Sequence, residues 1–412
     1  MYDLFIVDCD LLIQNKMTKI LQMTYWLSIA AIGYAYFGYP LLLWIVSLFK
    51  RDSLKKQEIY PFVSVIIAAH NEEEGIGNKI NNTLSLDYPQ DKLEIMVASD
   101  ASTDRTNEIV KGFIKNNRVE TQNFASLRLV EFNSHHGKTF VQNEAVKQAK
   151  GEILLFSDAT TLYEPNLLQK IVRNFADERV GAVGGELIYV NKKRTSVGEG
   201  NGLYWQYEKF IKKNESKVTS LIGVSGCCYA VRKELYEPID SDLISDFVIA
   251  QMIYKTGKRV VYEPEAISYE ETTSTSQDEF KMRVRVCLRT LHGLVRMRSM
   301  LNPLRYGFYA FQLISHKILR YSVPVFMMLL LLANVLLYNF TMWPFYEISL
   351  YLLLAFCVCA LLGWLTRRRK HLPLFYVPFY FCVTNFALLV GIVQFLQGKK
   401  MVVWKPLREN SV

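Results

Sequence analysis

Four long stretches of this chain contain no Asp, Glu, Lys or Arg, and they constrain what the chain can fold into more than any other feature. The stretches are Thr24 to Phe49, Tyr321 to Tyr346, Ile348 to Thr366 and Leu372 to Gly398. A helix needs about 20 apolar residues to cross a bilayer, and soluble cores rarely contain uncharged runs of that length. The pattern predicts a membrane protein with α-helical transmembrane segments.

The first stretch begins too late and is too long for a cleavable signal peptide, and no small-residue cleavage site ends it. We expect residues 24–49 to remain as a transmembrane helix, preceded by an N-terminal extracytoplasmic segment at residues 1–23. Residues 321–398 are expected to form three further transmembrane helices, followed by a basic tail at residues 399–412.

Basic residues cluster beside these stretches and contribute much of the net charge of +9. The clusters are Lys50, Arg51, Lys55 and Lys56 after the first stretch, Arg296, Arg298, Arg305, Lys317 and Arg320 before the second, and Arg367 to Lys370 after the third. Such clusters mark the cytosolic flanks of membrane helices. We therefore expect contact with a lipid bilayer and no nucleic acid, with residues 50–320 in the cytosol and the loop Thr341 to Glu347 outside.

The last stretch leaves a conflict in this topology. Three crossings return the Arg367 cluster to the cytosol, so a fourth crossing takes the tail outside. The tail nevertheless carries Lys399, Lys400, Lys405 and Arg408, which favour the cytosol. The last stretch either crosses the bilayer, re-enters it or lies partly in the interface, and these alternatives stay open.

Residues 60–190 alternate short apolar runs with helix-like stretches. Runs rich in β-branched residues predict strands at Val63 to Ala69, Leu93 to Ala98, Leu127 to Phe132 and Glu152 to Phe156. The stretches between and after them predict helices at Glu73 to Leu84, Thr103 to Lys115, Lys138 to Ala149 and Pro165 to Phe175. The repeated strand–helix–strand order predicts an α/β fold with a mainly parallel sheet covered on both faces.

Polar residues follow three of these strands, at the edge where parallel sheets bind ligands. The loops read HNE at residues 70–72, SDASTD at 99–104 and SDATT at 157–161. No GxGxxG, Walker A or HExxH motif is present, and the seven cysteines lack zinc-site spacing. The loops therefore do not support a dinucleotide, P-loop or zinc site.

Six segments, in this order, resemble the family 2 glycosyltransferases of GT-A fold, in particular the membrane-bound synthases of chitooligosaccharide, hyaluronan, poly-N-acetylglucosamine and cellulose. They are SVIIAAHNEEEGI, ASDASTDRT, GKTFVQNEAV, LFSDATT, GCCYAVRKELY and ISDFVIAQMIYKTGKRVVYEPEA. The resemblance implies a cytosolic GT-A domain at residues 50–300, which is a nucleotide-diphospho-sugar transferase, and a UDP-sugar as its donor.

In this family a strand-ending Asp-x-Asp motif binds Mg²⁺ or Mn²⁺ on the donor diphosphate, and such hard cations prefer carboxylate oxygens. The matching triplet here is Asp158-Ala159-Thr160, which keeps only the first carboxylate. The resemblance implies a catalytic metal ion held by Asp158, with Thr160 offering a hydroxyl or a coordinated water. The alternative for Asp158 is a cap on the following helix.

The resemblance also implies a nucleotide-sugar site. Asp100 is expected to contact the nucleoside, and Ala69, Asn71 and Glu72 are expected to line the base and ribose. Lys138 follows a glycine at a predicted helix start, where a helix N-terminus and an ammonium group both favour phosphate oxygens. A solvated surface lysine is the alternative for Lys138.

Processive synthases of this family carry a Gln-x-x-Arg-Trp motif, and the corresponding region here keeps arginines without the tryptophan. We expect Arg285 to bind the diphosphate and Arg289 to lie on the acceptor side. The missing ring removes a stacking surface for an acceptor sugar, which puts long processive synthesis in doubt. A solvated or lipid-facing basic helix is the alternative.

An acceptor hydroxyl loses its proton as it attacks the donor sugar, so inversion by direct displacement needs a general base. Asp246 matches the acidic residue of the family at a helix start, with Asp242 as the local competitor and helix capping as the alternative. Gly226 and Cys227 match the small-residue loop of the family beside the acceptor.

Residues 301–320 mix aromatic and basic residues, which predicts an interfacial amphipathic helix. This helix is expected to hold the acceptor site at the mouth of the membrane spans. His316 within it is expected to pack rather than to catalyse.

The sequence therefore predicts a multi-pass protein of the cell or inner membrane whose cytosolic domain is a hexosyl- or N-acetylhexosaminyl-transferase. It is expected to move sugar from a UDP-sugar to a growing glycan or lipid-linked acceptor in cell-surface or extracellular polysaccharide synthesis, with room for accessory export proteins. Two alternatives stay open: a single transfer to a polyprenyl lipid, and a catalytically silent membrane subunit of a glycan synthase.

Overall fold

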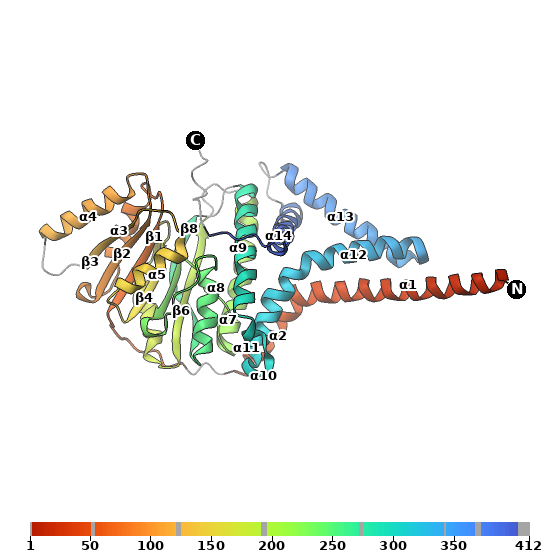
Figure 1. Cartoon of the computed structure of the whole chain (residues 1–412), viewed down its shortest axis with the longest axis horizontal. Coiled ribbons are helices and arrows are strands. Elements are labelled where there is room, and N and C mark those ends of the chain that lie inside the picture. The colour runs from red at the N-terminus through yellow and green to blue at the C-terminus, as the bar shows by residue number, and fades with distance from the viewer. Residues whose placement is uncertain are drawn as a thin grey trace.

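A mixed α/β domain and a group of long apolar helices make up the molecule (Figure 1). The computed structural model describes residues 2–50, 54–120, 125–190, 196–271, 275–341, 343–366 and 372–402. The sheet lies at one end of the molecule, and the long helices extend away from it toward the N-terminus.

One sheet of eight strands, in the order β3-β2-β1-β4-β7-β6-β8-β5, forms the domain. The strands are β1 (Val63–Ala69), β2 (Leu93–Asp100), β3 (Ser126–Phe132), β4 (Ile153–Asp158), β5 (Leu162–Tyr163), β6 (Val180–Val190), β7 (Cys228–Arg232) and β8 (Arg259–Glu271). The four predicted strands, β1 to β4, pair in parallel as expected. The other half of the sheet is mixed, because β7 runs antiparallel to β4 and β6, and β5 runs antiparallel to β8.

Helices cover both faces of the sheet, as predicted. They are α3 (Ile76–Leu84), α4 (Thr106–Glu120) and α6 (Leu167–Val172) on one face, and α5 (Lys138–Gln148) and α8 (Ser245–Lys255) on the other. Successive side chains of a strand point to opposite faces, so Val65 and Ile67 of β1 pack in the first core and Ile66 packs in the second. Three short 3₁₀ helices lie between these elements: η2 (Gln90–Lys92), η3 (Arg173–Ala176) and η4 (Lys233–Leu235).

The element boundaries follow the sequence closely at the start of the domain. Strand β1 has the predicted bounds. Helix α3 begins three residues later than the predicted Glu73, because the carbonyl of Glu72 first accepts hydrogen bonds from the amides of Gly75 and Ile76. A tight turn therefore separates the end of β1 from the helix.

Four helical stretches are long and apolar enough to cross a membrane by length and composition: Gln14–Leu48, Phe308–Thr341, Pro344–Thr366 and Pro373–Leu396. Each overlaps the corresponding uncharged stretch of the sequence, and the first three begin before it. The first helical stretch is built from α1 (Tyr2–Gly33), the π-helical turn η1 (Tyr34–Gly38) and α2 (Tyr39–Leu48). The second ends with α12 (Arg320–Thr341), the third is α13 (Pro344–Thr366) and the fourth is α14 (Pro373–Leu396). Because α1 begins at Tyr2, most of the predicted segment 1–23 belongs to the same helix as the start of the first span.

Helices α7 (Ser196–Val218) and α9 (Ser276–Arg296) lie between the sheet and the apolar helices. The stretch predicted as one interfacial helix, residues 301–320, is divided into η5 (Arg298–Leu301), α10 (Pro303–Tyr306), α11 (Phe308–Leu313) and the π-helical turn η6 (Ile314–Leu319). The break falls at Gly307, whose φ of 54° is a left-handed conformation that a helix cannot continue through.

A buried cluster of charges joins the domain to the membrane helices. His316 Nδ1 lies 2.7 Å from Glu215 Oε1, and its Nε2 lies 3.3 Å from Glu208 Oε2. Arg320 also pairs with Glu208 at 2.5 Å, and the Tyr39 hydroxyl donates to Glu215 at 2.7 Å. Buried charges are tolerated when they are paired and hydrogen-bonded. His316 therefore packs at the junction of α2, α7 and η6, as expected from the sequence.

Candidate active site

The end of β4 and the start of α5 meet at the centre of the site. Asp158 ends β4 and Lys138 opens α5. The Lys138 ammonium forms an ion pair with Asp158 Oδ1 and donates a hydrogen bond of 3.1 Å to the carbonyl of Gly226. Burial lowers the pKa of Lys138, but the carboxylates of Asp158 and Asp246 outweigh burial and hold this pKa above its ordinary value. Lys138 is therefore not a solvated surface lysine.

Asp246, in the first turn of α8, approaches the Gly226 loop from the other side. A β-carbon added at Gly226 would lie 2.8 Å from Asp246 Oδ2, so the loop backbone passes directly against this carboxylate. Burial raises the pKa of Asp246, and the nearby cations Lys138 and Lys317 offset part of that rise. A partly desolvated carboxylate with a raised pKa is suited to accept a proton at neutral pH.

Asp242, the local competitor of Asp246, has a different partner. Its Oδ2 lies 2.6 Å from the ammonium of Lys400, which comes from the end of the described chain. The described contacts therefore leave Asp246 as the carboxylate beside the Gly226 loop and Asp242 as the carboxylate that holds the tail.

Arg285 of α9 is the cation best placed to receive a ligand. The guanidinium is partly buried, and among the described residues it has neither a hydrogen bond nor an ion pair. Burial lowers its pKa, and the negative charges of Asp158 and Asp246 act in the opposite direction. Arg285 thus lies within the field of both carboxylates.

Arg289, one turn further along α9, already forms hydrogen bonds to other groups of the protein. It is buried and donates hydrogen bonds to Thr139 Oγ1 at 3.0 Å, to the carbonyl of Ser241 at 3.2 Å and to the carbonyl of Leu243. These contacts fix the loop before Asp246 against α5. The predicted acceptor contact of Arg289 remains a prediction, and the contacts observed are those of a positioning residue.

Asp100, at the end of β2, positions the loop that precedes Lys138. Its two carboxylate oxygens accept hydrogen bonds from the amides of His136 at 2.8 Å and Gly137 at 2.7 Å, and the His135 ring lies 2.8 Å from Oδ2. These bonds hold the loop that leads directly into Lys138. The predicted contact of Asp100 with the nucleoside stays a prediction.

The other predicted nucleotide-binding residues lie at the end of β1. Asn71 has a φ of 52°, a conformation that Asn tolerates better than most residues, and its Oδ1 accepts a hydrogen bond of 2.8 Å from the Thr103 amide. Glu72 is buried, with a carboxylate oxygen 3.8 Å from the position of a β-carbon at Gly75. Ala69 is buried within the strand, so its backbone is what it offers to a ligand.

Cys227, predicted beside the acceptor, is buried, and burial raises the pKa of its thiol well above the ordinary value. Its carbonyl accepts a hydrogen bond of 2.9 Å from the Tyr163 hydroxyl. The amide of Cys228 donates 3.0 Å to the carbonyl of Ser225, which closes the turn around Gly226. Cys227 therefore shapes the loop instead of presenting a reactive thiol.

Asp158 and Thr160 fit the implied divalent cation if a diphosphate supplies the remaining ligands. Asp158 supplies a carboxylate and Thr160 a hydroxyl, and within the described parts of the chain no group of three His, Cys, Asp or Glu side chains could hold a metal ion. Mg²⁺ often binds through one or two carboxylates and completes its shell with substrate phosphates and water. The residues therefore suit a cation that binds together with a diphosphate.

Lys79 of α3 was missed by the sequence reasoning. It is fully buried, its ammonium donates to the carbonyl of Thr161 at 2.7 Å, and it lies 3.4 Å from the centre of the Tyr163 ring. Burial lowers the pKa of Lys79 to about 7. The available signal was its position on the apolar stripe of the helix with Ile76 and Ile80, where a lysine needs buried partners. It anchors the segment that follows Asp158.

The chain matches two models of related protein families. The model described as "Glycosyl transferase family 2" matches residues 64–239, and the model described as "Glycosyl transferase family group 2" matches residues 153–390, which is more than half of the chain. The first match contains Asp100, Lys138 and Asp158, and the second contains Asp158, Asp246, α12, α13 and most of α14.

Two relatives of known description align with a little over half of this chain and of their own length. The probable glycosyltransferase YdaM of Bacillus subtilis is 27% identical over 242 residues, covering 57% of this chain and 56% of that protein. The poly-β-1,6-N-acetyl-D-glucosamine synthase of Staphylococcus epidermidis is 26% identical over 245 residues, covering 58% of this chain and 57% of that protein.

A solved structure shares the fold over nearly the whole chain. The mannosyltransferase PcManGT from Pyrobaculum calidifontis, in complex with GDP-Man and Mn²⁺, superposes with a TM-score of 0.70 and 24% sequence identity, covering 91% of this chain and 99% of that one. The predicted GT-A class with added apolar helices is thereby confirmed as the fold. With the family models spanning the sheet and the helices alike, the chain belongs to the family 2 glycosyltransferases.

Proposed function

We propose that this protein is an inverting glycosyltransferase that moves a hexose or N-acetylhexosamine from a UDP-sugar to a growing glycan or lipid-linked acceptor at the cytosolic face of the membrane. The observation that carries the proposal is the meeting of Asp158, Lys138 and Asp246 around the Gly226 loop. Two carboxylates and a lysine from three separate elements gather at one edge of the sheet. Similarity to the poly-N-acetylglucosamine synthases supports an N-acetylglucosamine donor as the first to test.

Asp246 accepts the proton of the acceptor hydroxyl in this mechanism. The raised pKa of Asp246 makes this carboxylate a stronger base than that of an exposed aspartate. The Gly226 loop holds the carboxylate in place. A positioned general base contributes about 10²–10⁴-fold to a rate. As the hydroxyl oxygen attacks the anomeric carbon, the bond to the diphosphate breaks on the opposite side of the sugar.

Lys138 and Arg285 stabilise the negative charge that develops on the departing diphosphate. Lys138 is tied to Asp158 by an ion pair and can exchange that partner for a phosphate oxygen, and Arg285 has no ion-pair partner among the described residues. Preorganised cations in a water-poor site stabilise such charge strongly. A Mg²⁺ or Mn²⁺ ion held by Asp158 and Thr160 would neutralise further charge on the diphosphate.

A cavity of about 340 Å³ lies between α7, α9 and the membrane helices. Tyrosines from η1, α7 and α14 line it together with Arg283, Lys317 and Arg320. Lys317 also contributes to the electrostatic environment of Asp246. The cavity therefore supports an acceptor that reaches the base from the membrane side, as a glycan or lipid-linked molecule would.

The experiment uses the full chain in liposomes, supplied with UDP-N-acetylglucosamine, UDP-glucose and GDP-mannose in turn. Release of the nucleoside diphosphate, UDP or GDP, and product mass are measured for the wild type and for Asp158→Ala. We expect release of UDP from one of the two UDP-sugars, no release of GDP from GDP-mannose, a large loss in the variant and a product extended by the transferred sugar. Equal release in both proteins contradicts the role of Asp158, and release that is absent with every donor contradicts the proposal and favours a silent subunit.

A second candidate is a single transfer to a polyprenyl phosphate. The cationic lining of the cavity favours it, because Lys317 has no ion pair among the described residues and could bind a phosphate at the head of a lipid. Arg283 and Arg320, which pair with Glu279 and Glu208, also line the cavity. Product mass separates the candidates: one added sugar on a lipid supports the single transfer, and a ladder of masses supports polymer growth.

A further inference from the structure

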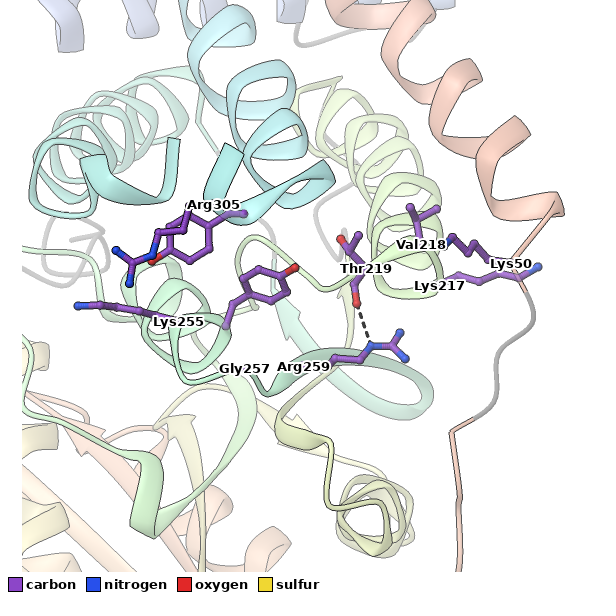
Figure 2. Close-up of a pocket in the computed structure, with 10 residues that line it drawn as sticks. Lys50, Lys217, Val218, Thr219, Lys255, Gly257, Arg259 and Arg305 are labelled. Carbon is purple, nitrogen blue, oxygen red and sulfur yellow. Dashed lines mark hydrogen bonds between the residues drawn. The ribbon is translucent and has the colours of Figure 1, made fainter. Parts of the chain in front are cut away.

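A second pocket, of about 670 Å³, lies away from the active site (Figure 2). It is bounded by the end of α7, the end of α8, the start of β8, α10 and the residue after the first membrane helix. Arg259 begins β8, which runs in the same direction as β4, so the pocket lies at the opposite edge of the sheet from Asp158. The pocket is therefore not an extension of the donor site.

Positive charge surrounds this pocket. Its charged lining residues are all basic: Lys50, Lys217, Lys255, Arg259 and Arg305. Figure 2 shows that they come from both sides of the pocket, with Lys50 and Lys217 opposite Lys255 and Arg305. Arg259 is used internally, since it donates to the carbonyls of Thr219 at 2.8 Å and Ser216 at 2.6 Å. The other four form no ion pair among the described residues, so an anion is the ligand that this lining suits.

Two exposed apolar residues are the sequence neighbours of two of these cations. Leu304, next to Arg305, is 96% exposed, and Phe49, next to Lys50, is 83% exposed. Lys50 comes two residues after the apolar stretch Gln14–Leu48, and Arg305 comes three residues before the stretch Phe308–Thr341. Exposed apolar residues and unpaired cations therefore occur together in the chain next to the ends of two candidate membrane spans.

We propose that this pocket binds the headgroup of an anionic phospholipid from the cytosolic leaflet. The phosphate would lie among the four cations, and the acyl chains would lie beside Leu304 and Phe49. Basic residues next to membrane spans are attracted to anionic lipid surfaces, and apolar side chains at the same level add burial in the interface. The inference rests on the membrane location proposed above and not on the identity of the sugar.

A lipid suits the pocket better than a free nucleotide does. The Tyr254 ring already stacks on Tyr309, with centroids 3.8 Å apart and an angle of 10° between the planes, so one of its faces is closed to a base. A soluble anion would also leave the apolar side chains of Leu304 and Phe49 exposed to water, whereas acyl chains would cover them.

The proposed lipid site touches the helix that carries Asp246. Lys255 is the last residue of α8, and Asp246 lies in its first turn. A headgroup bound at Lys255 therefore holds the far end of that helix, together with α7 and α10, against the membrane surface.

The test compares phospholipids on the purified full chain. The protein, in micelles containing equal amounts of dioleoyl phosphatidylglycerol and dioleoyl phosphatidylcholine, is analysed by native mass spectrometry for bound lipid. The variant Lys217→Glu/Lys255→Glu leaves Lys50 and Arg305 in place, because these flank the spans and influence their orientation. The control Lys115→Glu/Lys150→Glu changes the same charge at two exposed lysines elsewhere on the domain.

We expect the wild type and the control to retain phosphatidylglycerol preferentially, and the Lys217/Lys255 variant to lose at least about tenfold of that preference, since each charge contact to an anion is lost and replaced by repulsion. Should the variant misfold, Lys217→Gln/Lys255→Gln is used, and a partial loss is expected. Retained preference in the folded variants overturns the proposal. Displacement of phosphatidylglycerol by millimolar inorganic phosphate also overturns it, in favour of a soluble anion.

Lipid binding is measured without a sugar donor, which keeps this test separate from the proposed function. If the Lys217/Lys255 variant loses its preference for phosphatidylglycerol but still releases UDP, the lipid site is supported and is separate from sugar transfer. Absent UDP release with a preserved, Lys217- and Lys255-dependent preference leaves the lipid site supported and contradicts only the glycosyl transfer.

Discussion

At the scale of single residues, the site depends on the absence of one side chain. Gly226 lies so close to Asp246 that a β-carbon would be 2.8 Å from the carboxylate oxygen Oδ2. The same loop accepts the Lys138 hydrogen bond through the Gly226 carbonyl. A glycine here lets the proposed base and the proposed diphosphate cation share one loop.

Replacing Gly226 by alanine should therefore displace the Asp246 carboxylate. A shift of about 1 Å in a catalytic group can cost about 10²-fold in rate, so we expect kcat to fall by about tenfold or more with little change in UDP affinity. Gly223→Ala is the matched control, because its β-carbon would meet nothing closer than 3.7 Å. Equal turnover in the two variants would show that Gly226 does not position the base.

Lys317 should influence the pH dependence of transfer. A base works only when deprotonated, so activity falls as the pH drops through the raised pKa of Asp246. Lys317 lowers that pKa by its positive charge, though burial has the larger, opposite effect. Lys317→Met should therefore move the acidic limb of the kcat/KM profile to higher pH.

The control for Lys317 is Lys213→Met, an exposed lysine of α7 that is not among the charges acting on Asp246. This variant should keep the profile of the wild type. An acidic limb that stays in place, or moves to lower pH, in Lys317→Met would argue against Asp246 as the titrating base.

The sequence predicts candidate site residues where they lie in a motif, but it does not predict the contacts between them. Asp158, Lys138 and Asp246 stand in segments that resemble family motifs, so the sequence alone predicts them as site residues. The ion pair between Lys138 and Asp158 and the effect of Lys317 on Asp246 join distant parts of the chain. Such contacts depend on tertiary packing, which local sequence patterns do not contain.

At the scale of elements, the first half of the sheet followed from the sequence and the second half did not. The run VSVIIAA predicted β1 to the residue, because buried parallel strands are continuous apolar runs. Strands β6, β7 and β8 lie outside the simple alternation of strand and helix. The antiparallel placement of β7 between β4 and β6 is a long-range pairing that periodicity cannot specify.

Helices α9 and α14 should be sensitive to the size of one residue between them. A β-carbon at Gly391 would lie 2.8 Å from Cys287 Cβ and 3.3 Å from the carbonyl of Val284. Gly391→Ala is therefore expected to destabilise the protein by about 1–3 kcal/mol through overpacking, seen as a lower melting temperature in detergent.

Gly33→Ala is the control for this packing, since a β-carbon there would meet nothing within 4 Å and both positions are helical. It should melt at or slightly above the temperature of the wild type, because alanine favours a helix over glycine. Similar melting of the two variants would mean that α9 and α14 do not pack as closely as described.

At the scale of the whole molecule, the tail bears on the conflict left by the last apolar stretch. Lys400 pairs with Asp242, and the carbonyl of Lys399 lies 2.9 Å from His292 Nε2. Both partners belong to the domain side of the molecule. Figure 1 shows α14 foreshortened beside α9, whereas α1 and α12 run lengthwise away from the sheet. From these contacts we propose that α14 begins and ends on the side of the membrane that holds the domain.

Cysteine labelling on intact and inverted vesicles tests this topology, in a chain whose exposed Cys357 is replaced by alanine. Met401→Cys should react with a membrane-impermeant maleimide from the same side as Lys115→Cys in the domain. Trp343→Cys, in the loop between α12 and α13, should react from the opposite side. Labelling of Met401→Cys from the side of Trp343→Cys would mean that α14 crosses the bilayer.

The central claim is that one site, with Asp246 as its base, transfers a sugar. The most direct test measures UDP binding and UDP release in Asp246→Asn, which keeps the shape of the side chain and removes its basicity. We expect unchanged UDP affinity and a turnover lower by about 10²–10⁴-fold. Near-normal turnover in this variant would rule out Asp246 as the base.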